Sequence, residues 1–391
     1  MLRVAVGLAY RQLTHRGAKL IGALVGVSVA IILMFTQLGF QGALYDSAVS
    51  ASRALDADII LTGSEFQTMA FPFPWLPLHA VYDARGVDGV ASSRPFYATT
   101  LQISSPKTGR NLTTWLFAFA PDSPVFLHDD VNSQIDLIRL PETALIDTSS
   151  RNEIGDIAAQ VQRTGRIDLI LPSAGQSIQP VFKIRGVFKV GPTINVDGNI
   201  ITSDLNYYRL LGIPLDRVSL GVVRVAKGYD PLVVKQAIER QLGSQARVFL
   251  RDDFVKNEQK FYAEETPIGF IFGAGLAVGV VVGIVFISQV LHGIVSDNMR
   301  EYATLRAMGY KQSFFVTLVG SIAIAISIIT YIPSSIVAFF VYRLAASATK
   351  LPMVMKGSYL LEIFFIVVTM GLIAAFLSTK KLKQANPVDL F

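Results

Sequence analysis

The sequence contains no cysteine and few charged residues. The absence of cysteine excludes a disulfide bond, a cysteine-ligated zinc ion and a thiol nucleophile. Charged residues make up 16% of the 391 positions, whereas soluble domains average roughly 25%. Hydrophobic residues make up 51% and are concentrated in a few long runs. This distribution excludes a wholly soluble protein, a disordered chain and a fibrous repeat.

Sequence motifs for catalysis are also missing. The chain has no phosphate-binding GxxxxGK[ST] loop, no HExxH zinc motif and no GxSxG nucleophile motif. Its 4 histidines are scattered and do not have the spacing of metal ligands. We therefore predict that the chain is not an enzyme and has no cofactor or metal of its own.

Four apolar segments are each long enough to cross a membrane, which takes about 20 residues. They comprise residues 20–40, 268–291, 314–342 and 359–377. The third segment contains Pro333, and the fourth contains Glu362, the one charged residue within the four. The first is interpreted as an uncleaved anchor, because no small-residue cleavage site follows it directly. The predicted fold class is a membrane protein, with one span before and three spans after a large α+β domain.

The charges beside these spans predict their orientation. Four basic residues and no acid precede the first span, and such an excess favours the cytoplasmic side. An even number of spans then places both termini in the cytoplasm and residues 41–267 outside it, in a periplasm-like space. The net charge of +6 is explained by these flanks, so no nucleic-acid partner is expected. The predicted parts are residues 1–40, 41–267 and 268–391, the last with a cytoplasmic loop at 292–313 and a cytoplasmic tail at 379–391.

The first twenty residues interleave apolar and basic side chains. This pattern is typical of an amphipathic helix on the inner membrane surface, and a plain positively charged flank is the alternative.

Residues 41–267 are predicted to fold as a domain, because apolar and β-branched runs alternate with clusters of Gly, Pro, Asn and Asp. Predicted strands comprise residues 58–62, 96–103, 113–119, 167–171, 181–190 and 218–225. Helices are predicted at residues 230–242, which open with Asp-Pro, and at residues 252–265, which lead into the second span. The aromatic and proline-rich run at residues 71–78 is predicted to be a buried loop, with a mobile apolar lip as the alternative.

Small residues recur at intervals of four in two of the spans. Gly22 and Gly26 are followed by Ala30 in the first span, and the second span contains Gly275, Gly279 and Gly283. Such a stripe lets another helix approach closely. We expect these glycines to pack a pair of helices, within the chain or across a dimer. Chance is the alternative, since glycine is common in membrane helices.

The loop between the second and third spans is predicted to form a short helix. Ser296 or Asp297 can cap its start, and Gly309 can end it. Leu305 and Met308 would then expose apolar surface beside Arg306 at the cytoplasmic face. Such a helix, joined to two spans, could transmit a displacement from a cytoplasmic partner, although a simple connector between spans remains the alternative.

Residues 300–310 read REYATLRAMGY, and this loop resembles the coupling region of the FtsX/MacB-type ABC permeases. It is most similar to the DevC group, whose usual form is EYATLKAMGY. The approach to the second span at residues 266–273 and the tail NPVDLF at residues 386–391 also resemble that group. The resemblance extends over the whole chain in length and layout. Arg306 and Asn386 depart from the Lys and Asp that are usual there.

The resemblance implies a permease subunit in a bacterial inner membrane that forms a homodimer and binds a separate ABC ATPase. That ATPase would hold the ATP and the Mg. The resemblance also implies a periplasmic adaptor protein, a TolC-like outer-membrane channel and contact with membrane lipid, for export of a lipid-like or amphiphilic substrate. The residues implied to contact the ATPase are Arg300, Glu301, Tyr302, Leu305, Arg306, Met308 and Gly309.

Two other functions of the same superfamily remain open. An FtsX-like regulator would use the same mechanical coupling to switch a cell-wall enzyme, and a LolC/LolE-like protein would release lipoproteins. The tail and the loop between the third and fourth spans favour the DevC type. A membrane-bound enzyme is disfavoured because the sequence offers no catalytic constellation.

Overall fold

The structure is a computed structural model that describes residues 17–70, 74–172, 181–194 and 196–382. The predicted amphipathic segment at the N-terminus therefore lies largely outside the described residues, as do the tail motif at 386–391 and part of the proline-rich run. The chain divides into two compact units. The helical unit comprises Met1–Ala43, Ile268–Ala348 and Met353–Phe391, and the α/β unit comprises Leu44–Pro267 and Thr349–Pro352.

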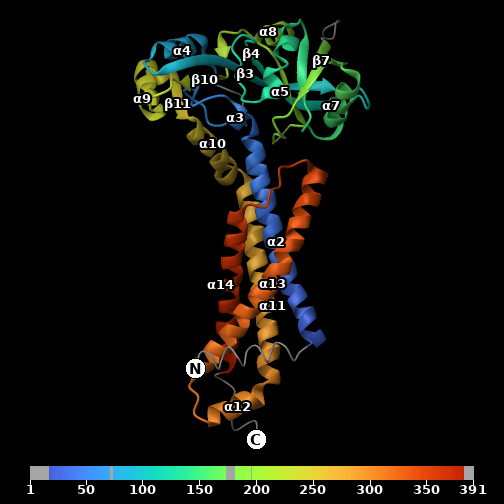
Figure 1. Ribbon diagram of the computed structural model, residues 1–391, viewed down its shortest axis with the longest axis vertical. Coiled ribbons are helices and arrows are strands. Elements are labelled where there is room, and N and C mark those ends of the chain that lie inside the picture. Colours follow the sequence, from blue (N-terminus) through green and yellow to red (C-terminus); the bar gives the residue numbers. More distant parts are fainter. Residues whose placement is uncertain (1–16, 71–73, 173–180, 195, 383–391) are drawn as a thin grey trace. The chain divides into compact units, whose positions relative to one another are not determined.

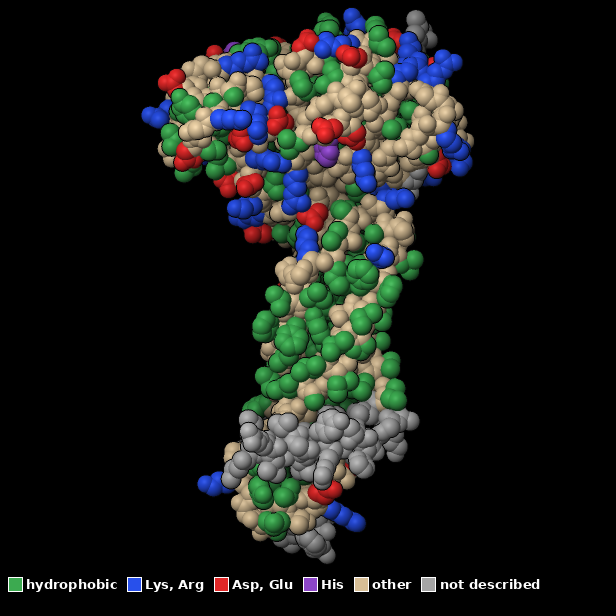
Figure 2. Space-filling view, in the orientation of Figure 1, with side chains coloured by type: hydrophobic (Ala, Val, Ile, Leu, Met, Phe, Trp, Pro, Cys, Tyr) green, Lys and Arg blue, Asp and Glu red, His purple; other side chains and the backbone are tan. Residues whose placement is uncertain are grey.

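Within the described residues, the helical unit contains four long helices and one short one, which Figure 1 labels. The long helices are α2 (Gly17–Ala48), α11 (Pro267–Asp297), α13 (Gln312–Thr349) and α14 (Gly357–Leu382), and the short one is α12 (Met299–Ala307). The candidate membrane spans are Leu24–Ala48, Pro267–Asp297, Gln312–Thr349 and Gly357–Thr379. On the face drawn in Figure 2, hydrophobic side chains are concentrated on the part of this unit that the grey atoms leave visible. The prediction of one span before and three after the domain is confirmed.

Hydrogen bonds join α13 to its neighbours in the helical unit. The hydroxyl of Tyr342 donates to the carbonyl of Phe35 in α2 at 2.5 Å. The hydroxyl of Tyr331 donates to the carbonyl of Leu360 in α14 at 2.8 Å, and a serine hydroxyl makes a second bond between α13 and α14. Interhelical bonds of this kind stabilise membrane helices by about 1 kcal/mol each. They hold α13 beside both α2 and α14.

The α/β unit is organised around a mixed sheet with the strand order β11-β1-β10-β3-β4-β8-β5-β7-β6, and β2 pairs separately with β9. The strands are β1 (Ile59–Gly63), β2 (Leu76–Pro77), β3 (Val90–Ser104), β4 (Asn111–Phe119), β5 (Thr143–Asp147), β6 (Ile167–Ile170), β7 (Val181–Phe188), β8 (Gly198–Ser203), β9 (Arg217–Val218), β10 (Leu220–Val225) and β11 (Ala246–Leu250). All six predicted strands are present, the last one divided at Ser219 into β9 and β10.

Helices cover both faces of this sheet (Figure 1). They are α3 (Ser50–Ala54), α4 (Leu78–Asp83), α5 (Asp129–Asn132), α6 (Ile135–Arg139), α7 (Asn152–Thr164), α8 (Asp204–Leu211), α9 (Pro231–Leu242) and α10 (Arg251–Lys260). The predicted helix at 230–242 is confirmed as α9, with the side chain of Asp230 accepting from the backbone N–H of Leu232 at 2.9 Å.

Side-chain alternation along the strands creates two cores. On β4, Leu116 and Ala118 pack with buried residues of α4, α7, α8 and α9. Phe117 and Phe119 point to the other face, where they pack with α3, α5, α6 and α10. Both rings contact Phe126, with ring centroids 6.2 and 5.7 Å away. The second core therefore lies between the sheet and α3 and α10, the helices closest in sequence to the first two spans.

Strand β3 joins the two halves of the sheet. It pairs with β10 through residues 90–96 and with β4 through residues 97–104. Ser219 lies at the change of partner, where its N–H donates to the carbonyl of Phe96 at 3.1 Å. Its hydroxyl oxygen accepts from the N–H of Ala98 at 2.9 Å. The two halves of the sheet are thus connected by the unbroken strand β3, and the buried Ser219 bonds to this strand where its partner changes.

The chain leaves the α/β unit through α10 and a turn of π-helix at Phe261–Glu265. Thr266 then has an extended backbone (φ −114°, ψ 157°), as expected for the residue before a proline. Pro267 begins α11, a position where its missing N–H costs nothing. The predicted helix at 252–265 is confirmed, but it is divided into an α-helical and a π-helical part.

Candidate functional site

The short helix α12 begins directly after α11. We predicted that Ser296 or Asp297 would cap it, and this is wrong, because both belong to α11 and Asn298 occupies the N-cap position. The Asn298 side chain does not cap α12. Its amide donates instead to the carbonyl of Ile294 at 2.7 Å, which closes the last turn of α11. Asn298 is the one residue between the two helices, and its side chain stabilises the end of α11 rather than the start of α12.

The end of α12 is fixed by Gly309, as predicted. Its φ of +89° lies in the left-handed region that favours glycine. The N–H of Gly309 donates to the carbonyl of Arg306 at 3.1 Å, and the N–H of Tyr310 donates to the carbonyl of Leu305 at 3.2 Å. This pair of bonds is the Schellman arrangement, which satisfies the last carbonyls of a helix.

Tyr302 anchors α12 to α13. Its side chain is buried, and its ring meets Phe315 edge-on with centroids 5.9 Å apart. We expected Tyr302 to be one of the residues that contact a partner protein. A side chain that is 2% exposed offers no surface of its own, so the position of Tyr302 is that of an anchor between two helices.

The other predicted contact residues lie on the outside of α12. Arg300, Glu301, Arg306 and Gly309 are exposed, and Leu305 is half-buried. Met308 is 70% exposed. The face thus presents charges of both signs next to a flexible apolar side chain. Such a surface can combine ion pairs with apolar packing in one small contact.

Glycines of α11 lie where α2 approaches. A Cβ atom added to Gly275 would lie 2.5 Å from Gln37, and one added to Gly279 would lie 2.6 Å from Met34. A Cβ on Gly283 would overlap Met370 of α14. These three residues therefore permit close approach of α11 to α2 and α14 within one chain.

The two glycines of α2 differ from each other. A Cβ on Gly26 would lie 2.7 Å from the ring of Phe286 in α11, so this residue belongs to the same contact. Gly22 has no heavy atom within 4 Å of such a Cβ and is exposed. Gly22 therefore does not take part in helix packing within the described chain.

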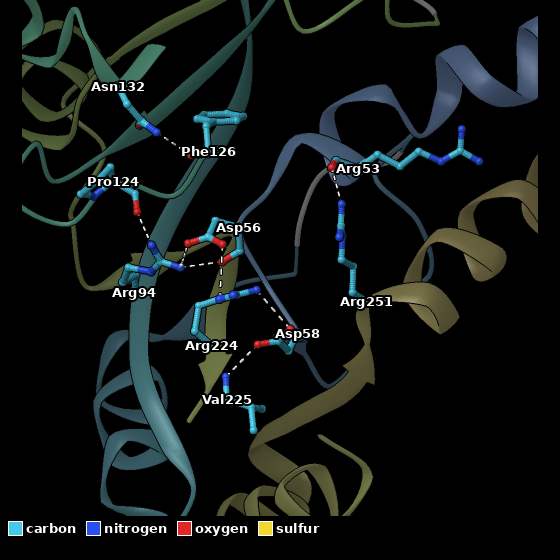
Figure 3. Close-up of polar contacts among 10 residues, drawn as sticks. All are labelled: Arg53, Asp56, Asp58, Arg94, Pro124, Phe126, Asn132, Arg224, Val225 and Arg251. Atoms are coloured by element: carbon cyan, nitrogen blue, oxygen red, sulfur yellow. Dashed lines mark hydrogen bonds and ion pairs between the residues drawn. The ribbon is translucent and has the colours of Figure 1, made fainter. Parts of the chain in front are cut away.

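An ion-pair network fixes the segment between α3 and β1 (Figure 3). Asp56 pairs with Arg94 of β3 at 3.2 Å and with Arg224 of β10 at 3.3 Å. Asp58 pairs with Arg224 at 3.1 Å and accepts from the N–H of Val225 at 2.9 Å. The chain that enters the sheet after α3 is thereby held to two of its central strands.

Glu258 of α10 is a buried carboxylate that fastens the loop after β1. Its oxygens accept from the hydroxyl of Thr68 at 2.8 Å and from the N–H of Met69 at 3.1 Å. In the same loop, Phe66 stacks on Phe254 of α10 with centroids 5.5 Å apart. Burial raises the pKa of Glu258 to about 7, although these hydrogen bonds act in the opposite direction.

Sequence reasoning missed both the Arg94–Asp56 network and Glu258. Arg94 lies outside the strand predicted at 96–103, which is too short, and a basic residue before a strand is usually solvated. Glu258 stands among charged and polar residues of α10, so its burial has no signal in the local pattern. Among the described residues, no group of three or more His, Asp or Glu side chains could hold a metal ion.

Four candidate spans, a large α/β domain after the first of them and a short helix between the second and third define a multi-pass membrane protein with an extramembrane domain. Residues 273–387 match the family described as FtsX-like permease C-terminal. The matched segment contains all of α12 and α13. No curated protein matches the chain.

Three solved structures are similar to the chain at low identity. The periplasmic region of MacB from Actinobacillus actinomycetemcomitans is 10% identical, with 52% of this chain and 94% of that one covered and a TM-score of 0.34. The extracellular domain of the noncanonic ABC-type transporter YknZ from Gram-positive bacteria is 12% identical, with coverage of 49% and 98% and a TM-score of 0.33. A domain of a putative permease from Porphyromonas gingivalis is 14% identical, with coverage of 50% and 86% and a TM-score of 0.30.

Proposed function

We propose that this chain is the permease subunit of an ATP-driven ABC transporter, and that α12 receives the force produced by a separate ATPase. The observation that carries the proposal is the position of α12 inside the FtsX-like segment, between two candidate spans. Its exposed face carries Arg300, Glu301, Arg306 and Met308. These residues resemble the coupling loop of the FtsX/MacB permeases.

The attachments of α12 make it suitable for this role. Tyr302 packs against Phe315 of α13, and Asn298 bonds to the last turn of α11. A displacement of α12 would therefore move α11 and α13 with it. In the sequence, α11 follows directly on the π-helical turn and α10, so the same displacement would reach the α/β unit through the continuous chain.

The remaining parts of the proposal rest on the resemblance of the loop and the tail to the DevC group. We propose a homodimer in the bacterial inner membrane with both termini in the cytoplasm and the α/β unit in the periplasm. The complex would export a lipid-like or amphiphilic substrate through a periplasmic adaptor and a TolC-like outer-membrane channel. In this arrangement ATP and Mg are bound by the ATPase, and the chain itself carries no cofactor.

Charge reversal on α12 tests the coupling. The variant Glu301→Arg combined with Arg306→Glu is purified as full-length protein in nanodiscs with the ATPase that co-purifies with the unaltered chain. We expect ATPase activity of the complex to fall at least about tenfold, because two exposed ion pairs become repulsive contacts, each costing on the order of 1 kcal/mol. Lys227→Glu, an exposed position of the α/β unit, is the control. Normal activity and normal co-purification of the double variant would refute the role of α12.

Chemical cross-linking in intact cells separates the proposed transporter from the other two functions. Capture of an adaptor and an outer-membrane channel supports export. Capture of a cell-wall hydrolase would replace export by regulation, and capture of a lipoprotein carrier would replace it by lipoprotein release.

A further inference from the structure

A cavity of about 380 Å³ opens between α3 and α10 in the α/β unit. Its lining consists of Arg53 from α3 and five residues of α10, namely Arg251, Asp252, Val255, Lys256 and Gln259. Three of these six side chains are cationic and one is a carboxylate. The cavity is therefore suited to an anion.

The cations of this cavity differ in how far carboxylates already neutralise them. Arg53 pairs with Asp46 at 3.0 Å, and Lys256 lies 4.0 Å from Asp253, at the limit of an ion pair. The guanidinium of Arg251 donates to the backbone carbonyl of Arg53 at 2.5 Å (Figure 3). Within the part of the chain that the structure describes, no ion pair joins Arg251 to a carboxylate. The positive charges of Arg251 and Lys256 are thus only weakly compensated by carboxylates and can interact with a ligand.

A neighbouring cavity of the same size has the opposite character. It also measures about 380 Å³ and shares Arg251 and Asp252 with the first cavity. Its lining adds the carboxylates of Asp58 and Asp230, so an anion would be repelled there. The excess of positive over negative side chains is therefore found in the cavity between α3 and α10.

Both walls of the cavity are close in the sequence to a candidate span. Arg53 lies five residues after Ala48, the last residue of the span Leu24–Ala48, which is at most about 18 Å of extended chain. Lys256 lies eleven residues before Pro267, where the next span begins, or about 16 Å at helical rise. The phosphate-bearing ligand available at that distance in quantity is the headgroup of a membrane phospholipid.

We propose that this cavity binds the phosphate headgroup of an anionic phospholipid. Arg251 supplies a guanidinium that can donate two parallel hydrogen bonds to phosphate oxygens, and Lys256 supplies a second positive charge. Gln259 adds an amide donor at the same wall. A bound headgroup would bridge α3 and α10, through which the chain enters and leaves the α/β unit. The proposal does not depend on an ATPase or on a transported substrate.

Lipid titration of the full-length protein in a neutral detergent tests this site. Native mass spectrometry measures the affinity for dioleoyl phosphatidylglycerol and for dioleoyl phosphatidylcholine. We expect Lys256→Gln to weaken phosphatidylglycerol binding about fivefold and Arg251→Gln with Lys256→Gln to weaken it about 25-fold, at about 1 kcal/mol for each cation. The paired control Arg209→Gln with Lys227→Gln removes two exposed cations elsewhere in the α/β unit and is expected to leave the affinity unchanged.

A local readout separates this cavity from lipid bound around the spans. Hydrogen exchange in Ser50–Ala54 and Arg251–Lys260 should slow in phosphatidylglycerol nanodiscs relative to phosphatidylcholine nanodiscs, and this difference should disappear in Lys256→Gln. The side chain of Lys256 is 76% exposed, so its loss does not threaten folding, and Arg251→Lys provides a second variant that keeps the charge.

Two results would overturn the proposal. Equal effects of the cavity variants and the control would show that the cavity does not hold the lipid. Full protection of both helices by inorganic phosphate or glycerol 1-phosphate, without added phosphatidylglycerol, would assign the cavity to a soluble anion instead of a lipid.

Discussion

The buried carboxylate of Glu258 predicts that the α/β unit loses stability as the pH rises towards neutral. Burial raises its pKa to about 7, from an ordinary value of 4.5. The folded state therefore binds a proton more tightly than the unfolded state does. The stabilising contribution is fully present below pH 4.5, declines between pH 4.5 and 7, and is absent above pH 7. The nearby Tyr262 does not interfere, because burial and the charge of Glu258 raise its pKa.

The size of the effect follows from the difference between the two pKa values. Each pKa unit corresponds to about 1.4 kcal/mol, so the limiting difference is about 3 kcal/mol. Between pH 5 and pH 8 the expected loss is about 2–3 kcal/mol, because part of the titration lies outside that range. This is a large fraction of the 5–15 kcal/mol that is typical of folded domains.

Tryptophan fluorescence of the full-length protein can measure this loss. The 2 tryptophans, Trp75 and Trp115, both belong to the α/β unit, so their signal reports the unfolding of that unit alone. Other carboxylates also contribute to the pH dependence, since burial raises the pKa values of Asp147 and Asp204. The informative quantity is therefore the difference between the unaltered protein and Glu258→Gln, measured from pH 5 to pH 8.

We expect the Glu258→Gln variant to lose much less stability than the unaltered protein over this range. Asp253→Asn changes a carboxylate on the same helix whose side chain is 55% exposed, and it should follow the unaltered protein with a constant offset. Parallel curves for the unaltered protein and Glu258→Gln would refute the reasoning, because they would mean that Glu258 titrates alike in the folded and unfolded states.

Three further outcomes follow from the packing. Tyr302→Ala should remove about 3 kcal/mol of packing between α12 and α13 and reduce ATPase co-purification, whereas Tyr302→Phe should retain both. Gly279→Val should lower the melting temperature in detergent, at a cost of about 1–3 kcal/mol, whereas Gly273→Val, with open space around the added Cβ, should not. Arg94→Met should destabilise the α/β unit by about 3 kcal/mol in denaturant titrations, because the carboxylate of Asp56 loses its less exposed partner.

The spans, the alternation of strands and the helix at α9 could be predicted because each has a local signal. A run of apolar residues or an Asp-Pro start is visible in a few adjacent positions. Strands β5 and β8 were missed for a related reason. Strand β8 is buried at every position, including the polar residues Asn199 and Thr202. Such a strand shows no alternation of polar and apolar residues.

The buried polar groups of β8 are satisfied by residues outside the strand. The amide of Asn199 donates to Asp147 at 2.9 Å and to the carbonyl of Gly191 at 2.9 Å. The hydroxyl of Thr202 donates to the carbonyl of Thr143 at 2.7 Å. No pattern within β8 itself could reveal these partners, since they belong to other segments of the fold.

For the short helix α12, too, the local sequence predicts only part of the structure. Its presence and its end at Gly309 were predictable from local residues. The inward direction of Tyr302 was not, because it depends on Phe315 in the following helix. A sequence motif of adjacent residues contains both residues that face a partner and residues that anchor the motif to the rest of the protein. The two kinds can be distinguished only from the packing in the structure.

The continuity of β3 has a mechanical consequence for the α/β unit. Tension applied through α3 and β1 would reach β10 and β3 through the hydrogen bonds of the sheet, and the unbroken backbone of β3 would carry it into the far strands. Flexing of the sheet would be concentrated at residues 96–98, where the neighbouring strand changes and Ser219 holds the backbone. Loss of the Ser219 hydroxyl would therefore loosen the connection between the two halves of the sheet.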